Sequence, residues 1–243
     1  MHEKSAYLSS RAEDGHKLAP DQLLELALRE HHPHIALACS FSAEDIAVLH
    51  MMTRINPRAR VFALDTGRLD AETYQVAEQV RRRLGIEIEW YFPQHEAVQS
   101  LIRARGVFSF KQSIGARKEC CHVRKVEPLA RALGGLTAWI TGLRRDQAAT
   151  RESLQQVEVD HAHGGIQKYN PIAFWCVEET WNYINAQGLP YNSLYERGYT
   201  QIGCQPCTTP VRPGEDVRAG RWRWEEPEHK ECGLHLHIAG SGI

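Results

Sequence analysis

The fold class is decided by residues 35–45, which read IALACSFSAED. The run begins with four apolar residues in succession, as in a strand that is covered on both faces of a sheet. A turn rich in hydroxyl groups follows, and from Ile46 onward apolar side chains recur at helical spacing. Strand, turn and helix in this order predict an α/β protein in which the turn can face a ligand.

The same alternation continues along the chain. Further strands are predicted at residues 61–64, 86–92 and 137–140, and helices at residues 20–32, 71–84, 96–105 and 178–185. Strands that alternate with helices indicate a doubly wound, mostly parallel sheet. The carboxyl ends of such strands meet at one edge, where ligands bind. We expect Ser40, Ser42 and Asp65 at that edge.

Two details of this pattern are specific enough to compare with a structure. In the helix at 71–84, Tyr74, Ala77 and Val80 are expected to face the core because they share one side of a helix. The segment Lys168–Pro171 is predicted to be a turn, because proline disfavours helical backbone in the residue before it.

Length and composition limit the classes of function. The chain has 243 residues and a net charge of −1, so one domain is expected and no global positive field favours nucleic acid or an anionic membrane. No apolar run reaches the length of a membrane span, and the first residues lack the apolar core of a signal peptide. We expect a cytoplasmic protein with one α/β domain over residues 1–226, loop-rich towards its C-terminal end, and a flexible tail over 227–243.

Seven cysteines in a cytoplasmic chain indicate metal binding or redox chemistry rather than disulfides. Four of them form two close pairs, Cys120 with Cys121 and Cys204 with Cys207, which suits structural zinc or an iron–sulfur cluster. Zinc is the commoner metal with paired cysteines. A cluster, however, spreads its ligands over several irons and can use adjacent thiolates, so the spacing leaves both metals open.

The other cysteines differ in their surroundings. The apolar neighbours of Cys39 and Cys176 predict small buried residues. Cys232 lies in a polar segment with Lys230 and His235, whose positive charges favour the reactive thiolate form. A spare exposed thiol is the alternative, but we expect Cys232 to be a nucleophile.

An anion site is indicated by hydroxyl and guanidinium groups. Ser40 and Ser42 precede a helix whose amino end can hold a phosphate, although serine is also a common helix cap. Arginine forks suit phosphate and sulfate oxygens, and glycine and tryptophan among them favour a pocket over a solvated surface loop. The arginines lie in two loops: Arg144, Arg145 and Arg151 in one, and Arg218, Arg221 and Arg223 in the other.

Together these segments resemble the assimilatory sulfonucleotide reductases, the family of adenylyl-sulfate (APS) and phosphoadenylyl-sulfate (PAPS) reductases. The resemblance covers nearly the whole chain, from residue 35 to residue 235. It is carried by SFSAED at 40–45, LDTGR at 64–68, TGLRRDQ at 141–147, KYNP at 168–171, IGCQPC at 202–207 and KECGLH at 230–235.

The resemblance implies a sheet of the adenine-nucleotide α-hydrolase-like type and the reduction of activated sulfate to sulfite in sulfate assimilation. The two cysteine pairs are those of the cluster-bearing APS reductase branch. By this resemblance Cys232 would be the catalytic nucleophile. The ligands of a [4Fe–4S] cluster would be Cys120, Cys121, Cys204 and Cys207.

The resemblance also implies the substrate-binding residues and the partner. Lys125 would lie between the cluster and the substrate, and the phosphosulfate would be held by Ser40, Ser42, Arg151, Arg218 and Arg221. Ala148 stands where the family pattern has serine, so Arg151 has the weakest support. The reductant would be thioredoxin or a similar dithiol.

Three alternatives remain. A cluster-bearing PAPS reductase differs only in accepting a 3′-phosphate. An ATP pyrophosphatase has the same fold, but its glycine-rich turn differs from SFSAED. A non-enzymatic zinc or redox-sensing module would leave the arginine loops unexplained. The oligomeric state stays open, a homo-oligomer included.

Overall fold

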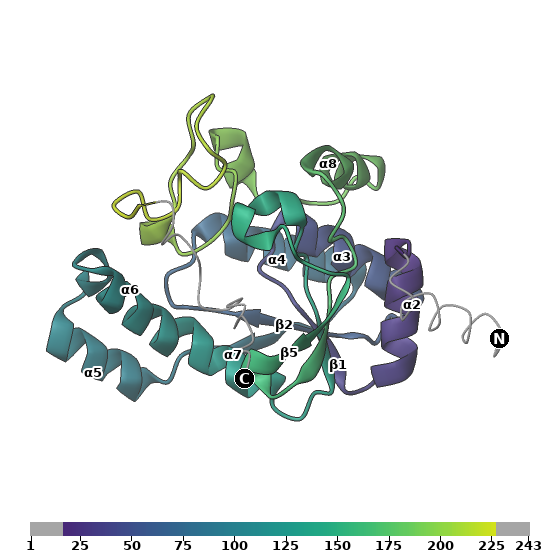
Figure 1. The fold of residues 1–243 in the computed structure, drawn as a ribbon, viewed down its shortest axis with the longest axis horizontal. Coiled ribbons are helices and arrows are strands. Elements are labelled where there is room, and N and C mark those ends of the chain that lie inside the picture. The colour runs from purple at the N-terminus through teal and green to yellow at the C-terminus, as the bar shows by residue number, and fades with distance from the viewer. Residues whose placement is uncertain (1–16, 227–243) are drawn as a thin grey trace.

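The computed structural model describes residues 17–226 of the chain (Figure 1). The strands are β1 Ile35–Ala38, β2 Arg60–Leu64, β3 Glu89–Tyr91, β4 Ala138–Ile140, β5 Val157–Asp160 and β6 Ile166–Tyr169. The α-helices are α2 Pro20–His31, α3 Ala43–Ile55, α4 Ala71–Leu84, α5 His95–Arg105, α6 Ile114–Cys121, α7 Glu127–Leu133 and α8 Val177–Ala186. Within residues 17–226, no helix combines the length and the apolar character that crossing a membrane requires.

The strands form one sheet in the order β3-β2-β1-β4-β6-β5. All neighbouring pairs are parallel except β5 with β6. The chain moves outward from β1 through β2 to β3 and then returns to the other side of β1 with β4. The loops after β1 and β4 therefore diverge, which creates the crevice where doubly wound sheets bind ligands. The predicted fold class is confirmed.

Both faces of the sheet are covered, as the apolar run at 35–38 predicts. Leu37 of β1 has no exposed surface and packs in the same cluster as the apolar side chains of α2, α3 and α4. Its neighbour Ala36 points to the opposite face, where Phe62 and Trp139 pack against Leu129 of α7. This alternation places the core on both sides of β1 and makes that strand the centre of the fold.

Most elements of the first 140 residues match their prediction, with two corrections. Strand β3 covers only Glu89–Tyr91 of the predicted segment 86–92. Ala77 and Val80 are buried, but Tyr74 is 40% exposed, so its predicted inward position is wrong. Tyr74 lies towards the surface because its hydroxyl donates a hydrogen bond to Asp65 Oδ2, at 2.9 Å, at the carboxyl edge of the sheet.

The predicted turn at Lys168–Pro171 is correct only in its second half. Lys168 and Tyr169 belong to β6, where Tyr169 pairs with Ile140 of β4. Proline argues against helix in the residue before it but does not exclude a strand. The pairing partner lies about thirty residues away, so a local pattern could not reveal it.

Residues 187–226 are loops and short 3₁₀ turns, as expected for a loop-rich C-terminal part. Two isolated β-bridges hold them in place: Leu69 pairs with Cys204, and Thr208 with Arg221. Because Leu69 follows β2, the first bridge fastens this segment over the carboxyl edge of the sheet. In Figure 1 the segment is drawn in yellow-green at the top of the molecule, while α5 and α6 project together at the left.

Candidate functional site

A cavity of about 590 Å³ lies at the carboxyl edge of the sheet, where the loops after β1 and β4 diverge. This volume is typical of small-molecule sites. Phe62, Leu129 and Trp139 give the cavity an apolar wall. The side chains predicted to bind substrate all line it: Ser40, Ser42, Lys125, Arg151, Arg218 and Arg221. The structure thus brings them together, while their contacts with a ligand stay a prediction.

The loop between β1 and α3 is held in a defined conformation. Phe41 adopts a left-handed backbone with φ of 61°, which is unfavourable for a residue with a side chain. Its ring is 1% exposed and packs 5.6 Å from the ring of Trp90, which offsets that cost. Ser42 is the N-cap of α3, since its Oγ accepts a hydrogen bond from the Asp45 N–H at 3.3 Å. The cap and a ligand contact are therefore compatible roles for Ser42.

Asp45 holds this loop through hydrogen bonds with Ser40. Its Oδ2 accepts hydrogen bonds from the Ser40 N–H at 2.7 Å and from the Ser40 hydroxyl at 2.6 Å. Burial raises the pKa of the Asp45 carboxyl to about 6; the hydrogen bonds from Ser40 act against this shift, and the charge of Glu44 adds to it. At mildly acidic pH, a fraction of the protein molecules therefore has Asp45 in its protonated form.

The loop after β4 passes very close to Asp45. A Cβ atom at Gly142 would lie 2.4 Å from Asp45 Oδ1 and 2.9 Å from the Asp45 backbone nitrogen. Real Cβ atoms essentially never approach other atoms so closely, so a residue with a side chain cannot fit here without a shift of α3 or of the loop. Glycine at 142 thereby sets the distance between the two loops of the crevice.

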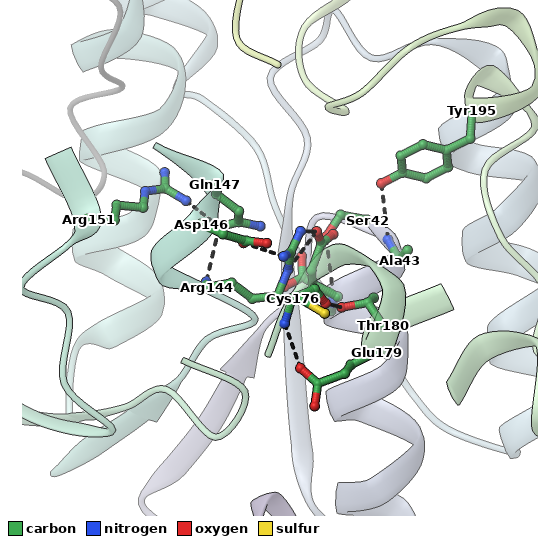
Figure 2. A network of polar contacts seen from close by, with 12 residues as sticks. Ser42, Ala43, Arg144, Asp146, Gln147, Arg151, Cys176, Glu179, Thr180 and Tyr195 are labelled. Carbon is green, nitrogen blue, oxygen red and sulfur yellow. Dashed lines mark hydrogen bonds and ion pairs between the residues drawn. The ribbon is translucent and has the colours of Figure 1, made fainter. Parts of the chain in front are cut away.

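Arg144 fastens the same two loops by charge (Figure 2). Its side chain is 5% exposed and donates hydrogen bonds to Glu44 Oε1 from Nη2 at 2.8 Å and from Nε at 3.2 Å. It also forms an ion pair with Asp146. Tyr195, from the C-terminal segment, accepts a hydrogen bond from the Ala43 N–H at 3.1 Å. These contacts place a wall of acidic and basic groups beside the amino end of α3.

The predicted arginine loops separate into cavity residues and others. Arg151 donates a hydrogen bond to Gln147 Oε1 at 2.5 Å, and Arg221 donates one to Thr208 Oγ1 at 2.8 Å while lining the cavity. Arg145 instead donates to the Leu154 carbonyl, and Arg223 pairs with Glu215 at the surface. For those two residues, the alternative of loop arginines with local partners is the correct one.

A second, smaller cavity adjoins the first and contains both cysteine pairs. It is lined by Cys120, Cys121, Cys204 and Cys207. Helix α6 carries the first pair at its end, and the π-helical turn η2 His122–Val126 follows at once. Such π-helical turns are rare and frequent at functional sites. Three residues line both cavities: Lys125, Cys204 and Arg221.

Two of the thiols in this cavity, those of Cys120 and Cys207, have raised pKa values. Burial raises the pKa of Cys207 to about 11, and the neighbouring Cys204 contributes to the shift. Burial also raises the pKa of Cys120, against the opposing effect of Arg68 and Arg124. Across residues 17–226, no three His, Cys, Asp or Glu side chains form a group that could hold a metal ion.

The cysteines outside this cavity have different positions. Cys39 is buried, as predicted, at 3% exposure. Cys176 is only half-buried and precedes α8 as its N-cap residue, so its prediction as a small buried residue is wrong. Cys232 lies outside the described residues, and its role as a nucleophile stays a prediction.

A buried ion pair connects the first cysteine pair with the C-terminal segment. Arg117 of α6 and Glu225 have side chains that are 1% and 3% exposed, with Arg117 Nε 2.6 Å from Glu225 Oε1. The Arg117 guanidinium also stacks 4.3 Å from the ring of Trp222. The backbone N–H of Trp222 donates a hydrogen bond to the Cys207 carbonyl at 3.1 Å. The pair therefore lies between the segments that carry the two cysteine pairs.

Comparison with known proteins shows the family to which the chain belongs. Residues 34–210 match the phosphoadenosine phosphosulfate reductase domain. The chain belongs to this reductase family. It is 48% identical to the adenosine 5′-phosphosulfate reductase of Burkholderia cepacia, over 85% of this chain and 82% of that protein. It is 44% identical to the enzyme of the same name from Pseudomonas aeruginosa, over 89% of this chain and 82% of that protein.

Solved structures agree with membership of the reductase family. The phosphoadenylyl-sulfate reductase of Candida auris, in complex with phosphate, has a TM-score of 0.68 at 26% identity and covers 79% of this chain and 91% of its own. The FMN adenylyltransferase of Candida glabrata has a TM-score of 0.57 at 11% identity, covering 88% and 72%. The second likeness concerns the fold alone. The expected family resemblance is confirmed.

Sequence reasoning missed several parts of this reductase site. Asp45 was visible only as part of a motif, although an acidic residue three positions after a serine cap is a recognisable signal. Gly142 carries no signal by itself, because its role is a contact with α3. Tyr195 and the pair Arg117–Glu225 come from distant segments, and no local pattern relates them to the site.

Replacement of Gly142 by alanine is expected to weaken nucleotide binding. The new Cβ must displace the backbone at Asp45, and with it the loop that carries Ser40 and Ser42. We expect at least a tenfold increase in the KM for the substrate and a loss of about 1–3 kcal/mol of stability. Gly115→Ala is the matched control, since its Cβ would meet only Ser113 Oγ at 3.8 Å. Equal effects of the two substitutions would contradict this account of Gly142.

Removal of the buried ion pair is expected to be far more costly than removal of an exposed one. Arg117→Met leaves Glu225 charged and buried, which should lower the free energy of unfolding by about 3–5 kcal/mol. Arg105→Met removes an exposed pair with Glu119, at 54% and 43% exposure, and should cost about 0–1 kcal/mol. Denaturant unfolding of both variants measures the difference. A similar, small loss of unfolding free energy in both variants would show that the buried pair stabilises the protein no more than the exposed pair does.

Proposed function

We propose that this chain is an oxidoreductase that reduces APS to sulfite and AMP. The observation that carries the proposal is the shared wall of the two cavities. Lys125, Cys204 and Arg221 line both the nucleotide-sized cavity and the four-cysteine cavity. A site of this composition suits a doubly anionic phosphosulfate held next to a metal centre. Relatives at 44–48% identity that are named adenosine 5′-phosphosulfate reductase support the same reaction.

We assign a [4Fe–4S] cluster to the four cysteines of the smaller cavity. Each ligand of a cluster can bind a different iron, so the adjacent thiols of Cys120 and Cys121 can both take part. The relatives at 44–48% identity that are named adenosine 5′-phosphosulfate reductase support the cluster-bearing branch of the family. Arg124 and Lys125 line the same cavity and would offset the negative charge of four thiolates. When bound, the cluster would supply a charged, rigid centre beside the substrate.

The residues of the larger cavity would bind and orient the substrate. Ser42 lines this cavity, and its oxygen acts as the acceptor in the cap of α3, so its hydroxyl can also turn to a ligand. Arg151, Arg218 and Arg221 would hold phosphate and sulfate oxygens. Lys125 would neutralise charge that develops on the oxygen between phosphorus and sulfur. The apolar wall around Trp139 provides a surface for the adenosine.

The chemistry then needs one thiolate. We assign it to Cys232, whose Sγ attacks the sulfur of the phosphosulfate. The new S–S bond forms as the bond between sulfur and the bridging oxygen breaks, and AMP leaves with that electron pair. Cys232 is left as an S-sulfonate. The cations of the cavity stabilise the charge that moves onto the phosphate.

A dithiol completes the cycle. One thiolate of thioredoxin, or of a similar protein, attacks Cys232 Sγ and releases sulfite, and the second thiol resolves the mixed disulfide. The dithiol supplies the two electrons and becomes a disulfide. A cytoplasmic location suits this chemistry, because it keeps thiols reduced; the cysteines at 39, 120, 121, 176, 204 and 207 are all free.

PAPS reduction is the second candidate. It is favoured by the name of the matched domain and by the likeness to a phosphoadenylyl-sulfate reductase structure. The two substrates differ only in a 3′-phosphate. The higher identity of the relatives named for APS makes that substrate the first choice.

Activity should require Cys232 and prefer APS. Protein purified without oxygen is expected to release sulfite from APS with thioredoxin, and much less from PAPS. Cys232→Ser should lower the rate at least ~10³-fold because it removes the nucleophile. Cys176→Ser, which changes a cysteine outside both cavities, should retain activity. A preference for PAPS would select the second candidate, and sulfite from neither substrate would refute the proposal.

Metal content tests the cluster separately from activity. The purified protein should be brown and contain about four irons and four acid-labile sulfides per chain. Cys204→Ser should lose most of this iron, whereas Cys176→Ser should keep it. Zinc in place of iron would contradict the cluster and favour a zinc site instead.

A further inference from the structure

Ser40 directs both of its hydrogen-bond donors away from the cavity that it lines. Its N–H and its O–H both donate to Asp45 Oδ2, at 2.7 and 2.6 Å. A hydroxyl group has a single hydrogen, and an ionised carboxylate can only accept. In this arrangement the exposed side of Ser40 Oγ presents lone pairs to the cavity.

Lone pairs on Ser40 Oγ are unfavourable for binding an anionic ligand. Phosphate and sulfate oxygens are acceptors, so they need donors from the loop. Ser42 can provide one, because its oxygen is the acceptor in the cap of α3 and its hydroxyl interacts with the Asp45 carboxyl more weakly than that of Ser40 does. While Asp45 is ionised, Ser40 can provide its hydroxyl hydrogen only by giving up the charge-assisted hydrogen bond to the carboxylate. A proton on Asp45 removes this conflict, since the carboxyl group then donates to Ser40 Oγ and frees the serine hydrogen.

We propose that Asp45 is a proton-linked positioning residue. When the anionic nucleotide binds, Asp45 takes up one proton from solvent, and the Ser40 hydroxyl turns its hydrogen from the carboxylate to the ligand. The proposal rests on the proposed function for the identity of the ligand. It adds a residue and a proton-linked step to substrate binding.

The electrostatic environment favours this uptake. Asp45 is 7% exposed, and its pKa of about 6 already lies near neutrality because of burial. Two negative charges of a phosphosulfate placed beside it would raise the pKa further, as like charges do. Gly142 closes the other side of the carboxyl group and leaves no room for a cationic side chain there.

The groups that face Asp45 do not replace it as the titrating residue. In the loop after β1, the buried Cys39 thiol has a raised pKa, and in the C-terminal segment the Tyr195 hydroxyl has one too; both groups stay neutral. From α3 itself, Glu44 is paired with Arg144 of the loop after β4. In the part of the chain that the structure describes, no histidine lines the cavity. Asp45 is therefore the group expected to change its protonation on binding.

Calorimetry of APS binding to the Cys232→Ser protein with its metal centre intact tests this directly. The substitution prevents turnover, and APS has no phosphate monoester, whose second pKa near 6 would add protons of its own. Titrations at about pH 7.5 in buffers of different ionisation enthalpy should show uptake approaching one proton. Affinity should be constant below about pH 6 and fall up to about tenfold per pH unit above it, because the free carboxyl ionises there while the bound one stays protonated.

Two variants in the same background separate this linkage from a structural role. Ser42→Ala removes a neighbouring hydroxyl that contributes the weaker of the two serine contacts to the Asp45 carboxyl, so it should weaken binding at every pH and change the proton uptake less than Ser40→Ala does. Ser40→Ala should weaken binding and also reduce the uptake by at least half. Asp45→Asn should abolish the uptake and give an affinity that does not depend on pH, provided that its circular dichroism and melting match the parent protein; Ser40→Ala serves alone if they do not.

The outcomes distinguish the two proposals. Tight APS binding without proton uptake, or uptake that persists in Asp45→Asn, would overturn the role of Asp45 and leave the proposed function intact. Absence of APS binding at any pH would overturn the proposed function and this inference with it.

Discussion

The whole site depends on the close approach of the loop after β4 to the amino end of α3. Parallel pairing of β1 with β4 brings these two loops together, and Gly142 lets them touch where any side chain would collide with Asp45. Arg144 then spans the contact through Glu44. Because this contact sets the position of the serine loop, the width of the crevice follows from sheet topology and one glycine rather than from flexible surface residues.

The C-terminal segment adds what the sheet cannot provide. It contributes Cys204 and Cys207, the arginines at 218 and 221, and Tyr195 above α3. The bridge between Leu69 and Cys204 fastens it near its middle, and the buried pair Arg117–Glu225 fastens it at its end. Two cysteine pairs that lie about eighty residues apart in sequence thereby line one cavity. A loop segment can define a site here because buried charges and backbone bridges replace the regular hydrogen bonding of a helix or strand.

The sequence allowed prediction of what is encoded locally. The apolar run of β1 and the bounds of α4 depend on neighbours within a few residues, and both are found as predicted. Ser42 caps α3, a role that the sequence allowed beside ligand binding. Strand β6 and the exposure of Tyr74 depend on partners far along the chain, and there the predictions failed. The same holds at the site: the motif gave Ser40 and Ser42, but the significance of Asp45 required the distance to Ser40 and its burial.

Charge balance explains why carboxylates are present in an anion site at all. The described lining of the larger cavity has five cations, Lys125 and the arginines at 144, 151, 218 and 221, against the three carboxylates Glu44, Asp45 and Asp146. The cavity therefore has an excess of positive charge with which to attract a phosphosulfate, in a chain whose net charge is −1. Without the carboxylates, five neighbouring cations would repel one another before the substrate binds. Glu44 and Asp146 meet this need through Arg144, whereas Asp45, bonded to a neutral serine, is the one that can give up its charge when the substrate brings its own.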